Sequence, residues 1–89
     1  MFFNSTMRHE EFIKLLVWQK AGVISGKQPS EWRMDDYGRE IFWGAYGDRD
    51  SRYGWEIDHI YPKSKGGSDS LGNLRPLHWI SNLLKSDKC

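Results

Sequence analysis

The chain has 89 residues and a formal net charge of +1 at pH 7, with 13 Lys and Arg against 12 Asp and Glu. A chain of this length forms one small domain, so we expect residues 1–89 to fold as a single unit. The balanced charge excludes a surface that is basic throughout, and any contact with nucleic acid must come from a local patch. The single cysteine, Cys89, excludes an internal disulfide and a cysteine-rich zinc site, so no structural zinc is expected.

The same sequence gives no sign of export or membrane insertion. It has no apolar run of the length that a membrane span requires, and residues 1–4 do not open a secretory signal. We therefore expect an intracellular, cytoplasmic protein without a membrane partner. The five Trp, four Tyr and four Phe must supply much of its core, since each buried aromatic removes roughly 150–250 Å² from water.

The first expected element is a helix over residues 7–20. Good N-cap residues precede it, namely Asn4, Ser5 and Thr6. Phe12 and Leu16 lie four residues apart, which places both on one helix face. Gly22 is a plausible end of the helix, and we expect this helix to be a packing element of an N-terminal region that covers residues 1–36.

The middle of the chain alternates between turns and a short strand. Residues 22–30 contain Gly and Pro and indicate a connecting loop, after which Trp32 and Met34 are expected to pack on the first helix. Residues 35–38 indicate a turn that leads into a strand over residues 39–43. We expect this part to add a segment resembling a β-hairpin to the domain.

The last part of the chain predicts a strand, a loop, a second strand and a helix. Apolar and polar residues alternate over 53–60, the period of a strand, and Pro62 agrees with an end just before it. The following elements are expected at 63–72 (loop), 74–78 (strand) and 79–87 (helix). Asp58 and His59 point to opposite faces of a regular strand, so they serve one site only if the strand ends or bends near His59.

Four polar side chains interrupt the apolar pattern of this region. They are Asp58, His59, Asn73 and Asn82. A small domain rarely places a carboxylate, an imidazole and two carboxamides at such positions unless they are paired or hold a ligand. These residues are therefore the candidates for a functional site.

The stretch that carries these residues resembles the HNH nuclease family. It reads I-D-H-I-x-P-x-S-x-G-G-x-D and then N-L-x-P-L-H-W-x-x-N-x-x-K-x-D, with spacings of 73 − 59 = 14 and 82 − 73 = 9 that fit the family. Asn82 stands where many members have a final His. A weaker likeness extends upstream over residues 32–41. The resemblance implies an α+β fold with a small ββα-metal core, here at about residues 53–88.

The chemistry of the residues points the same way. Asp58 and Asn82 offer a carboxylate oxygen and an amide oxygen, a sparse set that favours Mg²⁺, or Mn²⁺, over zinc. His59 is then free to act as a general base, because an imidazole is largely neutral near pH 7. The resemblance implies the same roles, adds that Asn73 holds the first strand and its histidine in place, and implies products with 5′-phosphate and 3′-hydroxyl ends.

Several side chains have more than one interpretation. His78 lies one helical turn before Asn82 and is a candidate for metal or phosphate contact, or a packing residue. The basic residues that flank the motif are candidate phosphate contacts or ordinary surface charges; they are Lys63, Lys65, Arg75 and Lys85. Asp58 has the alternative of pairing with Arg75 or Lys85, and His59, Asn73 and Asn82 have purely structural alternatives.

We therefore expect a metal-dependent endonuclease that hydrolyses DNA. Its small size and charge favour help from a targeting protein or a homodimer. One alternative is a nucleic-acid-binding module of the same fold that does not cleave and acts within a larger assembly. Another is a purely structural domain built on the Trp-rich core, which leaves the motif spacing unexplained.

Overall fold

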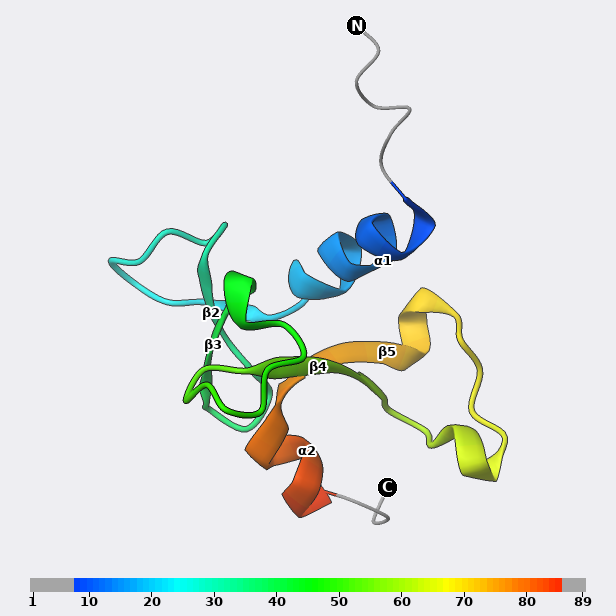
Figure 1. Cartoon of the computed structure of the whole chain (residues 1–89). Coiled ribbons are helices and arrows are strands. Elements are labelled where there is room, and N and C mark those ends of the chain that lie inside the picture. Colours follow the sequence, from blue (N-terminus) through cyan, green and yellow to red (C-terminus); the bar gives the residue numbers. More distant parts are fainter. Residues whose placement is uncertain (1–7, 86–89) are drawn as a thin grey trace, which may run out of the picture.

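The computed structural model describes residues 8–85, and Figure 1 shows their arrangement. In chain order the elements are α1 (His9–Trp18), β1 (Gly22–Val23), β2 (Trp32–Met34), β3 (Glu40–Phe42), η2 (Trp43–Ala45), β4 (Trp55–His59), η3 (Lys63–Lys65), η4 (Leu71–Asn73), β5 (Leu74–His78) and α2 (Trp79–Lys85), where η denotes a 3₁₀ turn. This confirms the α+β class. Within the described residues no helix has the length and apolarity to cross a membrane, and the cytoplasmic location stays a prediction.

Helix α1 is shorter at both ends than the sequence pattern predicted. It begins at His9, with Arg8 at the N-cap position and no capping bond from that side chain. The expected caps, Asn4 to Thr6, lie outside the described residues. The helix ends at Trp18, because the next residues close tighter turns, such as the bond from the Ala21 amide to the Trp18 carbonyl. Gly22 then begins a strand.

A three-stranded antiparallel sheet forms the middle of the chain, with the order β1-β2-β3. Residues 32–34 are its central strand, so the expectation that Trp32 and Met34 merely pack on α1 was incomplete. The turn at 35–38 is confirmed: Oδ1 of Asp35 accepts bonds from the amides of Tyr37 and Arg39, and Gly38 has a φ of 86°. The strand expected over residues 39–43 is observed as β3, whereas β1 and β2 carry too little alternation for sequence reasoning to find them.

The last part of the chain has the predicted strand–loop–strand–helix order. Strands β4 and β5 pair antiparallel, from Trp55 opposite His78 to His59 opposite Leu74. Figure 1 shows α2 below this pair and the loop that joins the strands, with η3 and η4, projecting beyond their far end. Strand β4 is a few residues shorter than the expected range 53–60, and it ends at His59. The end of the strand thus falls on the candidate histidine.

The core of the domain lies on one face of β4. Trp18 and Trp55 pack with their ring centroids 5.0 Å apart, and Trp43 meets Trp18 edge-on at 5.5 Å. Ile41 completes this cluster, and Ile57 packs against it. Because side chains alternate along a strand, Trp55 and Ile57 take the core face, and the polar residues between them turn to the other face, where α2 lies.

Candidate active site

Helix α2 presents two polar side chains to the polar face of β4. Asn82 and Lys85 lie three residues apart on the helix and therefore share a face. Nδ2 of Asn82 donates to Oε1 of Glu56 over 2.8 Å, and Nζ of Lys85 donates to Oδ1 of Asp58 over 2.8 Å. Glu56 and Asp58 are two residues apart on β4, so they also share a face. The helix and strand are therefore joined by two parallel polar contacts.

Asp58 is a buried carboxylate with two cationic partners. It is 6% exposed, and its other oxygen, Oδ2, accepts a 2.9 Å bond from Nε of Arg75. The interpretation of Asp58 as a pairing residue is therefore confirmed for both candidate partners, although this does not decide whether it also binds a metal. The side chains of Arg75 and Lys85 are largely buried with it, at 15% and 9% exposed. Such pairing is required because a buried carboxylate without a partner is costly.

Arg75 also connects the site to the three-stranded sheet. Its NH1 group donates to Asp36 over 3.2 Å and its NH2 group to the hydroxyl of Tyr37 over 3.3 Å. Burial works to lower the pKa of Arg75, but its hydrogen bonds to Asp58 and Tyr37 outweigh this and raise the pKa. The guanidinium thus stays charged while it spans the turn of one sheet and a strand of the other.

Glu56 is a neighbour of the site that sequence reasoning missed. The guanidinium of Arg49 donates two hydrogen bonds to the carboxylate of Glu56, and the one from NH2 to Oε1 is 2.8 Å long. These bonds, followed by the one from Asn82, lower the pKa of Glu56 despite its partial burial. The alternation of β4 contained the signal, because a residue two positions before Asp58 faces the same way.

His59 lies at the last position of β4 and faces the connecting loop. Its Nε2 lies 2.8 Å from Oδ1 of Asp69, and Nζ of Lys63 donates to the other oxygen of Asp69 over 3.1 Å. The contact with His59, and next that with Lys63, lowers the pKa of Asp69. The imidazole is 27% exposed. The sequence placed Asp69 in the loop over residues 63–72, and its contact with His59 was not anticipated.

Asn73 holds the two ends of the loop together. Its Oδ1 accepts a 2.9 Å bond from the amide of Tyr61, and its Nδ2 donates to the carbonyls of Tyr61 at 3.1 Å and Ser68 at 2.7 Å. Its own carbonyl accepts from the amide of Ile60. These bonds fix the chain directly after His59, which is the structural role that the family resemblance implies.

The described residues do not bring the three principal candidates into mutual contact. Asp58 and His59 are adjacent in sequence but face opposite sides of β4, and Asn82 meets Glu56 rather than Asp58. Residues 8–85 contain no cluster of three or more His, Cys, Asp or Glu arranged to hold a metal. That criterion does not address a sparser set of one carboxylate and one amide, so the assignment of Asp58 and Asn82 as metal donors stays a prediction.

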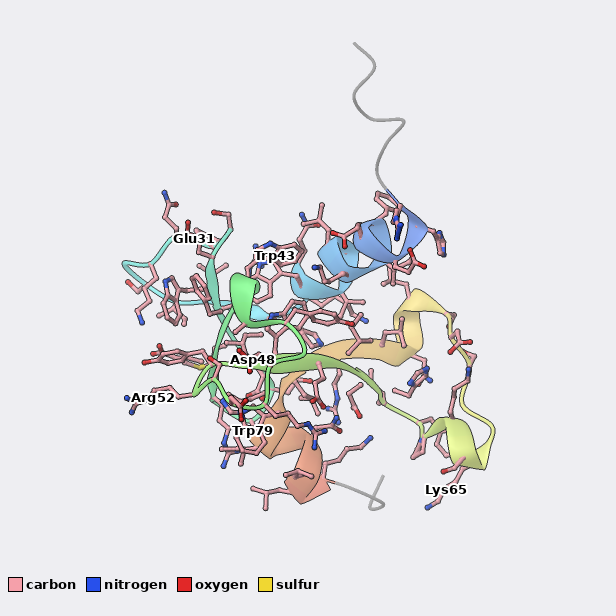
Figure 2. The ribbon with its side chains drawn as sticks, in the orientation of Figure 1. Glu31, Trp43, Asp48, Arg52, Lys65 and Trp79 are labelled. Carbon is pink, nitrogen blue, oxygen red and sulfur yellow. The ribbon has the colours of Figure 1, made fainter. Side chains whose placement is uncertain are left out.

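His78 lies at the opposite end of the strand pair from His59. It is 3% exposed, its Nε2 lies 2.8 Å from the carbonyl of Arg52, and its Nδ1 accepts from the amide of Ile80. Both ring nitrogens are thus engaged in packing the start of α2. The ring lines a hollow of about 680 Å³ beside Arg52 and Trp79, both labelled in Figure 2. Its hydrogen bonds within the described residues go to Asp35, Arg52 and Ile80, and not to the other candidates.

Two of the candidate phosphate contacts are on the surface. Lys63 is exposed and bridged to Asp69, and Lys65 is exposed on the loop that Figure 2 shows projecting from the domain. Arg75 and Lys85 are instead committed to Asp58. The basic patch of the structure is thus smaller than the sequence suggested and lies on the loop beside His59.

The site belongs to a strand–strand–helix unit in which a histidine ends the first strand and an asparagine closes the loop behind it. Residues 46–88 match the family model of the HNH endonucleases. This match supports the family resemblance that the motif indicated, and the matched segment contains all four motif residues. No curated protein and no solved structure matches the chain.

Proposed function

We propose that the chain is a metal-dependent endonuclease that hydrolyses phosphodiester bonds in DNA. His59 is its general base, Asp58 and Asn82 are its metal donors, and Asn73 fixes the strand end. The observation that carries the proposal is the family match over residues 46–88. The contacts of Asn73 support it, because they hold the backbone directly behind a partly exposed imidazole.

The chemistry of the donor set fits a hard divalent cation such as Mg²⁺ or Mn²⁺. A carboxylate and an amide oxygen are ligands of this class, and the two oxygens of Asp58 already hold an ammonium and a guanidinium. An ion that binds Asp58 through Oδ1 must displace Lys85 or share the carboxylate with it. The bound ion would neutralise charge on the phosphate and stabilise the leaving oxygen.

His59 supplies the proton transfer. It takes a proton from the attacking water, whose oxygen forms the new bond to phosphorus. The bond to the 3′ oxygen breaks, and that oxygen takes a proton from solvent, so the products carry 5′-phosphate and 3′-hydroxyl ends. Asp58 and His59 are consecutive residues, with Cα atoms about 3.8 Å apart. Their side chains face opposite sides of the strand, so a phosphate that contacts both must bind across the end of β4.

The substrate contacts that we propose come from the loop. Lys63 and Lys65 are exposed on the loop that follows His59 and are suited to phosphate oxygens. We assign Arg75 and Lys85 to the neutralisation of Asp58, because their side chains are largely buried against it. Because only two of the four flanking cations face solvent in the described residues, we propose that recognition of a particular DNA depends on a targeting protein or a homodimer.

One observation favours the second candidate, a nucleic-acid-binding module of this fold that does not cleave. The carboxylate of Asp58 is already balanced by two cations, and a metal gains less from a neutralised ligand than from a free one. In this case the domain contributes only DNA contacts within a larger assembly. The two candidates differ in metal affinity.

Plasmid cleavage tests the proposal. Purified protein is expected to nick supercoiled DNA with Mg²⁺ or Mn²⁺ and to stop when EDTA is added, while titration calorimetry detects Mg²⁺ binding that Asp58→Asn abolishes. Glu31→Gln is the matched control, because Glu31 is exposed and lies far from the loop in Figure 2. Binding of DNA without cleavage under any divalent metal, and without metal binding, would establish the module instead.

A further inference from the structure

Asp69 is the one carboxylate of the connecting loop that contacts the candidate base, and the family roles discussed above leave it without a function. Its Oδ1 lies 2.8 Å from Nε2 of His59, and it is 67% exposed. We propose that Asp69 is a positioning residue that holds the His59 ring with Nε2 protonated and leaves Nδ1 as the nitrogen that accepts the proton of water. This inference rests on the proposed role of His59.

The hydrogen-bonding chemistry of the pair determines which nitrogen is free. An ionised carboxylate only accepts, so the Nε2 atom of His59 must carry the hydrogen that lies between them. A neutral imidazole has one hydrogen, and its other nitrogen then carries the lone pair. The carboxylate also stabilises the imidazolium that forms when the ring takes up a proton. Asp69 thus fixes both the orientation of the ring and the site of protonation.

The loop holds Asp69 in place independently of His59. Nδ2 of Asn73 binds the carbonyl of Ser68, the residue directly before Asp69, over 2.7 Å. Lys63 binds the second carboxylate oxygen over 3.1 Å. An exposed ion pair on a free surface contributes little, but here the Asn73 side chain holds the backbone near each partner, at Tyr61 and at Ser68. The contact is therefore preorganised, which is the condition for a positioning residue.

The turn at the outer end of the loop is also held in a specific geometry. Gly66 has a φ of 97°, and a Cβ placed on Gly67 would lie 1.8 Å from the carbonyl oxygen of Tyr61. The loop therefore folds back closely on the residue two positions after His59. This close approach brings Asp69 beside the end of β4 although ten residues separate it from His59.

The simpler interpretation is that Asp69 only pairs with Lys63 and stabilises the turn. The two interpretations differ in what happens to the imidazole when the carboxylate is removed. A structural role leaves the Nε2 proton of His59 as exposed to exchange as before. A positioning role removes its acceptor, so the proton is lost to solvent and the resonance of Nε2 moves.

The test is the ¹⁵N and ¹H spectrum of the His59 imidazole in the metal-free full chain, at one fixed pH where the ring is neutral. The wild-type protein is expected to show a downfield Nε2–H proton. Asp69→Ala should remove this signal, Asp69→Asn should retain it in weakened form because its amide oxygen still accepts, and Glu31→Gln should leave it unchanged. An identical Nε2 resonance in Asp69→Ala and the wild type would overturn the proposal.

Kinetics give the second measurement. Asp69→Ala is expected to lower kcat about ten- to a hundredfold with little change in KM, and Asp69→Asn to recover part of it. A rise in KM alone, with kcat intact, would assign Asp69 to DNA binding and contradict the positioning role. Because the spectrum is recorded without metal or DNA, it decides the proposal even if the wild-type protein proves not to cleave.

Discussion

Arg75 is the cross-strand partner of Asp58 and donates a 2.9 Å hydrogen bond from Nε to Oδ2 of that carboxylate. The pair lies directly opposite on β4 and β5, and Arg75 continues to Asp36 in the turn between β2 and β3. We predict that Arg75→Ala lowers the free energy of unfolding by about 2 kcal/mol, since hydrogen bonds to charged groups contribute about 1.5–3 kcal/mol each. Urea denaturation measures this change.

The surface cation Lys65 is the matched control for Arg75. It is exposed on the loop, and Lys65→Ala should alter stability by less than about 0.5 kcal/mol. Equal stability losses for the two variants would show that the guanidinium of Arg75 does not hold the sheets together. A DNA affinity that falls for Lys65→Ala but not for Arg75→Ala would support the division between loop contacts and buried pairing.

Replacement of His59 separates the base from the metal donors. His59→Ala should reduce cleavage by a factor of about 10²–10⁴, which is the usual contribution of a general base. The affinities for Mg²⁺ and for DNA should change little, because Asp58 faces the other side of β4, and Asn82 contacts that side from α2. These are measured by calorimetry and by a gel-shift titration. A loss of metal binding in His59→Ala would make the imidazole a ligand and would reject its assignment as the base.

The sequence predicted the C-terminal unit well because its signals are local. Each signal depends on near neighbours in the chain. These signals are the alternation along β4, the two adjacent glycines and the apolar spacing of α2. Asn73 was recognised through its spacing, and its three side-chain bonds to residues 61 and 68 agree with the structural role that the resemblance implies. Pro62 indicated a strand that ends at residue 60, and β4 ends one residue earlier, at His59.

The pairing of Asp58 with Arg75 or Lys85 was one of the alternatives, but the other partners of the charged groups were not predictable in this way. The contact of Asp69 with His59 and that of Asn82 with Glu56 depend on how the loop and α2 fold back, which no short window of sequence contains. Arg75 was interpreted as a candidate phosphate contact because a sequence does not show which residue a basic side chain pairs with. The register of β4 and β5 places it opposite Asp58 instead.

Gly67 and Gly72 provide a matched pair of positions for testing the geometry of the connecting loop. A Cβ on Gly67 would lie 1.8 Å from the carbonyl oxygen of Tyr61, whereas a Cβ on Gly72 would meet nothing within 4 Å. Gly67→Ala should therefore force the backbone to move and destabilise the protein by about 1–3 kcal/mol, and it should also lower cleavage by shifting the loop. Gly72→Ala should leave thermal unfolding nearly unchanged. Equal tolerance of both substitutions would mean that the close approach at Tyr61 is not maintained in solution.

The pKa of Asp69 predicts a pH dependence with a definite sign. The bonds from His59 and then Lys63 lower this pKa in the folded state, so the unfolded chain binds the proton more readily. The stabilisation is complete above the pKa of the unfolded chain and is lost as the pH falls through the lower folded value. The thermal midpoints of the wild type and Asp69→Asn should thus differ at pH 6 and converge toward roughly pH 2. A constant difference across this range would contradict the assigned contacts.

Asn73 offers the sharpest test of how the end of β4 is held. Asn73→Ala removes three side-chain hydrogen bonds to residues 61 and 68, and at about 0.5–1.5 kcal/mol each we expect a loss of roughly 2–3 kcal/mol. Hydrogen exchange should accelerate most at the amide of Tyr61, because its acceptor disappears, and little at the amide of Trp43, which bonds to the carbonyl of Glu31 at a distant edge.

The imidazole signal of His59 extends this test to function. If Asn73 fixes both the strand end and Asp69, then Asn73→Ala should weaken the downfield Nε2 proton of His59 without touching either partner. Asn73→Asp retains the acceptor for the Tyr61 amide but loses both donations, so it should fall between Ala and wild type in stability. An unchanged His59 signal in Asn73→Ala, together with lost stability, would confine Asn73 to folding and leave Asp69 to position the ring alone.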